Sequence, residues 1–236
     1  MAGKDDKVPA SAPATDAEVR AFLGKVAQVP PAGAGSGRLI FAMDATASRE
    51  PSWDTACDIQ AEMFSTTAAI GRLQVQLAYY RGFQEFHASP FVDDAEALAR
   101  RMCAVTCRGG RTQIGRVLRH AAAENAGQKV SALVFAGDAC EEKVDSLCHG
   151  AGELGLRGVP AFIFHEGADA QAGRVFKEIA RLSGGAYCRF DSASARTLRE
   201  LLSAVAVYAV GGHPALEDYH RRAGRVVLRL TAPSGS

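Results

Sequence analysis

The chain has 236 residues, of which 47% are hydrophobic and 22% charged, a composition typical of a soluble globular protein with one sizeable α/β domain. Its formal net charge of +1 gives no general attraction to nucleic acid or to an anionic membrane surface, so neither is expected as a partner. The polar start at residues 1–7 lacks the apolar region of a signal peptide, and no apolar run is long enough to span a bilayer. These features predict a cytoplasmic protein.

Residues 1–37 are predicted to form a flexible leader, because they are rich in Ala, Pro, Gly and Ser. Within the leader, residues 16–23 have the composition of a short helix with Thr15 or Asp16 as its N-cap. We expect such a helix to dock either on the following domain or on a partner.

An α/β domain is predicted over residues 38–212. Residues 38–43 form a continuous apolar run that stops at Asp44, as expected of a strand buried on both faces. Residues 73–80 alternate at period two and predict a half-buried strand, with residues 83–87 returning beside it as an antiparallel edge strand. Further apolar strands are predicted at residues 130–136, 159–164 and 186–190.

Helices are predicted between these strands, at residues 52–70, 94–105, 112–126, 141–156, 174–183 and 193–210. Short apolar strands that alternate with helices predict a Rossmann-like, doubly wound and mostly parallel sheet with helices on both faces and one antiparallel edge strand. Residues 213–236 are predicted to be a C-terminal tail, in which residues 225–230 are a candidate additional edge strand.

Polar residues follow the apolar strands where a ligand would be expected. In an open parallel sheet, ligands bind at the carboxyl ends of the strands, where the strand order reverses. Five oxygen-bearing side chains are predicted to meet at that edge: Asp44, Thr46 and Ser48 after the first strand, Thr112 at a helix start and Asp138 after the central strand. Such oxygens suit a hard divalent cation, with Mg²⁺ as the leading candidate and Mn²⁺ or Ca²⁺ as alternatives. The two glycines before Thr112 would let the loop backbone approach the ion closely.

Each of these residues also has an ordinary structural explanation. An Asp followed by Ser or Thr at a strand end is common in turns and helix caps. Thr112 alone is better explained as the N-cap of the following helix, and Asp138 alone could cap a helix that starts near Glu141. Only their order and shared position favour a metal site.

The pattern Asp44-x-Thr46-x-Ser48, then Thr112, then Asp138 resembles the metal-ion-dependent adhesion site of von Willebrand factor A domains. The family pattern is Asp-x-Ser-x-Ser with a separated Thr and a separated Asp, and the resemblance spans residues 38–210. It implies that Thr46, Ser48 and Thr112 supply hydroxyls, while Asp44 and Asp138 act largely through water. The chain departs from the pattern at Thr46, which replaces Ser, and at Gly137-Asp138-Ala139, where many members have Thr-Asp-Gly.

The resemblance implies a protein–protein interaction module rather than an enzyme. Such a module would bind a Glu or Asp of a protein partner through the cation, within an intracellular assembly for which an ATPase or chaperone complex is one candidate. Trp53 and Glu141 lie close in sequence to the metal loops and are candidate partner contacts, although Trp53 equally suits a buried packing role.

Two alternatives stay open. A metal-dependent phosphohydrolase could use Asp44 as nucleophile, but the second acid that such a mechanism needs two residues later is replaced by Thr46. A metal-free structural scaffold is the other alternative.

Overall fold

A computed structural model describes residues 15–28, 36–49, 53, 63–67, 69–190 and 195–222. The candidate tail strand at 225–230 and most of the predicted helix at 52–70 lie outside the described residues, although Trp53 and residues 63–67 are helical. Among the described residues, no helix is both long and apolar enough to cross a membrane.

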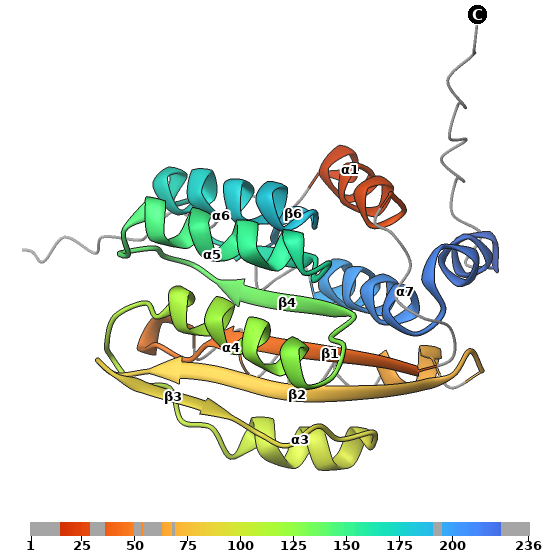
Figure 1. Ribbon diagram of the computed structural model, residues 1–236, viewed down its shortest axis with the longest axis horizontal. Helices are drawn as coiled ribbons and strands as arrows, with labels where there is room; N and C mark the ends of the chain where they lie inside the picture. Colours follow the sequence, from red (N-terminus) through yellow and green to blue (C-terminus); the bar gives the residue numbers. More distant parts are fainter. Residues whose placement is uncertain are drawn as a thin grey trace, which may run out of the picture.

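Six strands form one sheet in the part of the chain that the structure describes (Figure 1). Their order is β3-β2-β1-β4-β5-β6, and every neighbouring pair is parallel except β2 and β3. The strands are β1 Ser36–Asp44, β2 Arg72–Arg81, β3 Glu85–Ala88, β4 Ala132–Gly137, β5 Ala161–Glu166 and β6 Tyr187–Phe190. The prediction of a doubly wound, mostly parallel sheet with one antiparallel edge strand is confirmed. The strand order reverses beside β1, so the carboxyl ends of β1 and β4 form the switch point.

Helices cover both faces of this sheet (Figure 1). The helices α1 Asp16–Val26, α3 Ala95–Cys103 and α7 Ala195–Arg222 contribute to one apolar core. The helices α4 Ile114–Gly127, α5 Val144–Leu156 and α6 Ala170–Ser183 contribute to the core on the opposite face. The sheet is therefore apolar on both sides, which is why β1 is buried at every position after Ser36.

The second strand is more deeply buried than its alternating sequence predicts. Gln76 was expected on an exposed face, yet it is only 3% exposed, because the side chains of α4 cover that face of β2. Its amide is satisfied there, since Nε2 donates to Glu124 at 3.3 Å and Oε1 lies 2.8 Å from the Nε2 atom of His120. The alternation of apolar and polar residues in this strand therefore does not predict which side chains are exposed.

The predicted leader contains an ordered helix that packs on the domain. Thr15 caps α1 through a capping box with Glu18, in agreement with one of the two expected caps. Phe22 is 1% exposed, and its ring lies 5.9 Å from the ring of Phe162 and 5.3 Å from that of Phe164. The helix therefore packs on the domain through Phe22 and Val26, one of the two dockings expected of it.

The last helix extends beyond the predicted end at residue 210. It bends at Gly212, whose φ of 62° and ψ of −153° are not helical, and then continues to Arg222. Pro214 follows the bend, where its missing N–H costs least. Leu216 is 1% exposed in the same core as Phe22, so the start of the predicted tail also packs on the domain.

Candidate metal centre

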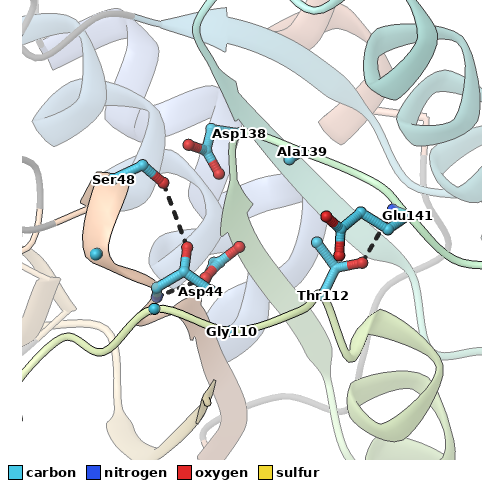
Figure 2. A pocket seen from close by; sticks show the side chains of 10 residues that line it. Asp44, Ser48, Gly110, Thr112, Asp138, Ala139 and Glu141 are labelled. Carbon is cyan, nitrogen blue, oxygen red and sulfur yellow. Dashed lines mark hydrogen bonds between the residues drawn. The ribbon is translucent and has the colours of Figure 1, made fainter. Parts of the chain in front are cut away.

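The switch point of the sheet carries a pocket of about 240 Å³. All five predicted site residues, Asp44, Thr46, Ser48, Thr112 and Asp138, line it, together with Ala47, Gly109, Gly110, Ala139 and Glu141. Figure 2 shows their side chains around one hollow, reached from the end of β1, the loop before α4 and the loop after β4. Five residues spread over 95 positions of the sequence, Asp44 to Asp138, are thus brought together by the strand order.

Asp44 is the most deeply placed of these residues. It ends β1 opposite Tyr80 of β2 and has no exposed surface. Its Oδ1 accepts from the backbone N–H of Thr46 at 2.7 Å, and its Oδ2 accepts from the Tyr80 hydroxyl at 3.0 Å. Burial raises the pKa of Asp44, the hydrogen bonds from Thr46 and Tyr80 oppose that rise, and the charge of Asp138 adds to it.

Tyr80 contacts the candidate site and was not predicted from the sequence. It is completely buried and its ring stacks on Phe135, which fixes the direction of the hydroxyl. Burial and the Asp44 carboxylate raise the pKa of the Tyr80 phenol well above its usual value, so it stays a donor at neutral pH. The alternation of residues 73–80 places Tyr80 on the same face as Gln76, which was expected to be exposed, and only the parallel register sets Tyr80 beside Asp44.

Thr46 and Ser48 lie in the loop directly after β1. The loop continues as a short 3-10 helix, Ala47–Arg49, and the hydroxyl oxygens of Thr46 and Ser48 lie 3.3 Å apart. Neither side chain is buried, and both residues line the pocket. The methyl group that distinguishes Thr46 from Ser does not move its hydroxyl away from that of Ser48.

Thr112 is not a helix cap, although this is the better explanation of the residue when it is considered alone. The N-cap of α4 is Gln113, which makes no side-chain capping bond, and the N–H groups of Ile114 and Gly115 donate instead to the Glu142 carboxylate. The Thr112 hydroxyl accepts from the backbone N–H of Glu141 at 3.0 Å. A hydroxyl oxygen has two lone pairs, so one acceptor position remains on the pocket side.

Asp138 does not cap a helix either, because α5 begins at Val144 with Lys143 at its N-cap. The Oδ1 atom of Asp138 is buried and makes no hydrogen bond within the described structure. A buried carboxylate oxygen without a partner is costly, and a cation or an ordered water is the usual explanation. The oxygen set of this pocket therefore fits a hard divalent cation.

This fit depends on hydroxyls as much as on carboxylates. Within the described residues, no group of three or more His, Cys, Asp or Glu side chains is arranged to hold a metal ion. The candidate site has two carboxylates, Asp44 and Asp138, and its remaining three oxygens come from hydroxyls.

Gly109 and Gly110 line the pocket, and Gly110 is also needed for a contact that was not predicted. A Cβ atom at Gly110 would lie 1.9 Å from the carbonyl oxygen of Gly82, so glycine is required by contact with the β2–β3 turn. A Cβ atom at Gly109 would meet nothing within 4 Å. The loop before Thr112 is therefore shaped by the neighbouring hairpin.

A buried arginine lies next to the pocket and was also missed. Arg49 follows Ser48, is 1% exposed and forms an ion pair with Glu166 at the end of β5. Burial lowers the pKa of the Arg49 guanidinium, whereas the charges of Asp138 and Asp44 raise it. An arginine directly after the metal loop gives no signal of burial in the sequence.

Of the two predicted partner contacts, the structure leaves one accessible. Trp53 is 2% exposed, and its indole N–H donates to the carbonyl oxygen of Met102 at 2.8 Å. Its ring also packs edge-on against Tyr79. The interpretation of Trp53 as an exposed partner anchor is therefore wrong, and the packing alternative is correct. Glu141 is exposed on the pocket rim.

Comparison with solved structures shows a similar fold in several proteins. The chain is similar to a von Willebrand factor type A protein from Catenulispora acidiphila, with a TM-score of 0.59 and 15% identity over 75% of this chain and 44% of that one. It is also similar to the SpRpn10 VWA domain, with a TM-score of 0.53 and 15% identity over 75% of this chain and 97% of that one. A third similar structure is proximal thread matrix protein 1 from the mussel byssus, with a zinc-occupied metal-ion-dependent adhesion site. Its TM-score is 0.53 and its identity 15%, over 73% of this chain and 46% of that one.

The chain therefore has the fold of von Willebrand factor A domains. It spans less than half the length of the Catenulispora and mussel proteins. No protein-family model and no curated protein sequence matches it. At this level of identity, the likeness extends to the fold, and the function has to be argued from the pocket.

Proposed function

We propose that the chain is a metal-dependent protein-interaction module that binds a Glu or Asp side chain of a partner. The observation that carries the proposal is the convergence of three hydroxyls and two carboxylates on one pocket, where a buried Asp138 oxygen accepts no hydrogen bond from the described residues. A divalent cation bound there would supply an open coordination position for an anionic ligand.

The residues around the pocket are suited to hold such an ion and to leave it able to bind a further ligand. Tyr80 and the Thr46 N–H orient the Asp44 carboxylate, and the Glu141 N–H orients the Thr112 hydroxyl. Groups that orient ligands in this way typically set metal affinity. Because three of the five candidate ligands are neutral hydroxyls, a bound cation would keep affinity for a carboxylate from outside.

An enzymatic alternative has less support. A phosphohydrolase that used Asp44 as nucleophile would need a cationic side chain to neutralise the phosphoryl group. The described residues that line the pocket include no lysine, arginine or histidine, and the buried Arg49 next to the pocket is paired with Glu166. Metal-dependent hydrolysis of a phosphate ester that is lost in Asp44→Asn would nevertheless overturn our proposal.

The proposed partner is a protein with an accessible acidic side chain. An ATPase or chaperone complex and a cytoplasmic location are further proposals, which rest on the resemblance and on the sequence composition. Glu141, exposed at the rim, would contact the partner on the α5 side and would favour a basic or neutral group there.

The test is a selection of short random peptides, displayed on phage, against the chain stripped with EDTA and then supplied with Mg²⁺ or Mn²⁺. We expect enrichment of peptides that contain Glu or Asp, and loss of that enrichment both in EDTA and in Asp44→Ala. Asp94→Ala is the matched control, since Asp94 caps α3 and does not line the pocket. Enrichment that is unchanged in EDTA and in Asp44→Ala would reject the metal bridge.

A further inference from the structure

A large apolar side chain is exposed next to the candidate metal centre. Phe83, in the turn between β2 and β3, exposes 73% of its surface, and the other exposed large apolar residues of the described chain are Val144 and Leu156. Exposed aromatic side chains on a rigid surface are typical anchors of protein interfaces. In Figure 1 the β2–β3 turn lies at the end of the sheet toward which the arrowheads of β1 and β4 point, which is the end that carries the pocket.

The turn that carries Phe83 is fixed to the loop that lines the pocket. The backbone N–H of Arg111 donates to the carbonyl oxygen of Gly82 at 3.0 Å, and the Gln113 amide donates to the carbonyl oxygen of Arg81 at 3.2 Å. The close approach of Gly110 to Gly82 leaves no room for even a methyl group between the two backbones. Phe83 therefore has a fixed position relative to Thr112 and the proposed ion.

The rim of the pocket is electrostatically asymmetric. On the side of the β2–β3 turn, Arg108 and Arg111 are exposed. The Glu85 carboxylate on that side accepts from Arg81 at 2.8 Å and from Arg108 at 3.3 Å, so its charge is already balanced. On the α5 side, the rim carries the exposed Glu141. An acidic segment would approach with its additional negative charge toward the turn and away from Glu141.

We infer that the β2–β3 turn selects the residues next to the metal-bound acid of the partner. Phe83 would contact an apolar side chain near that Glu or Asp, and Arg111 would contact a second acidic side chain. The partner segment is thus an acidic peptide with an apolar residue beside its metal-binding carboxylate. This inference rests on the proposed function, and it adds a sequence preference that the metal alone cannot give.

The experiment is an array of synthetic peptides with a fixed central Glu and each neighbouring position varied in turn, probed with the Mn²⁺-loaded chain. Wild type is expected to favour an apolar residue at one offset and an acidic residue at another. Phe83→Ala should weaken binding of the favoured peptide by about tenfold or more while keeping the requirement for Glu. Arg111→Ala should remove the preference for the second acid. Leu156→Ala is the matched control, because Leu156 is 93% exposed and does not line the pocket.

The outcomes separate this inference from the proposed function. Glu-dependent, EDTA-sensitive binding whose neighbour preference is unchanged in Phe83→Ala and Arg111→Ala would overturn the inference and leave the metal bridge intact. Binding that survives EDTA but is lost in Phe83→Ala would keep the turn as a contact surface and reject the metal bridge. No binding by wild type would reject both. Both substituted residues are exposed, and thermal melting of each variant verifies that it is folded.

Discussion

Removal of the Tyr80 hydroxyl should weaken the metal site without touching any proposed ligand. In Tyr80→Phe, Asp44 keeps the Thr46 N–H on Oδ1 at 2.7 Å but loses the donor that lies 3.0 Å from Oδ2. Both side chains are completely buried, so water does not replace the lost donor. A hydrogen bond to a charged group contributes about 1.5–3 kcal/mol, and loss of an orienting partner typically costs about 10–100-fold in metal affinity. We therefore expect Mn²⁺ affinity to fall by about 10–100-fold.

The assay is calorimetric titration of Mn²⁺ into wild type, Tyr80→Phe and Tyr79→Phe. Tyr79 is the matched control, since it undergoes the same chemical change on the same strand but packs against Trp53 and His87, away from Asp44. Urea unfolding of the metal-free proteins should also show Tyr80→Phe to be less stable by about 1–3 kcal/mol. Equal Mn²⁺ affinity of the two variants would refute the orienting role of Tyr80.

Three further changes test other parts of the structure. Burial raises the pKa of Asp44, so ionisation of this carboxyl lowers the stability of the folded protein as the pH rises through that pKa. Metal-free Asp44→Asn should therefore unfold at a higher urea concentration than wild type at pH 7, and this difference should disappear in acid. A urea midpoint of Asp44→Asn below that of wild type at pH 7 would contradict this expectation. Arg49→Met should lower the free energy of unfolding by about 3–5 kcal/mol, because it leaves Glu166 without its ion pair. Adding Glu166→Gln should recover part of that loss, whereas additive losses of the two substitutions would disprove the coupling. Phe22→Ala should cost about 3–5 kcal/mol in thermal or urea unfolding, and an unchanged midpoint would mean that α1 is not part of the cooperative unit.

Most of the architecture could be predicted from local pattern. Apolar runs that stop at polar residues marked β1 and β4 and their carboxyl ends, and so predicted that Asp44 and Asp138 lie at one edge of the sheet. The left-handed Gly184, with φ of 75°, ends α6 after Ser183, the residue at which that helix was predicted to end. These features succeed because each depends on a few neighbouring residues.

The parts that failed depend on contacts between distant segments. Gln76 and Arg49 are polar and were therefore not expected in the interior, yet each finds buried partners on another element. Gly110 suggested close approach to an ion, but its partner is the turn at Gly82, which only the tertiary arrangement brings near. Trp53 next to the metal loop suggested an exposed anchor, while the exposed aromatic side chain is Phe83 on a hairpin turn. Burial and pairing register are set by the whole fold, so a single sequence gives little access to them.

The central claim is that this pocket binds a divalent cation through Asp44 and Asp138. Its most direct test is calorimetric titration of Mg²⁺ and Mn²⁺ into the EDTA-stripped chain, with Asp44→Ala and Asp138→Ala alongside. The account predicts saturable binding of one ion by wild type and none by either variant. Absence of heat with wild type, or identical titrations for all three proteins, would contradict it.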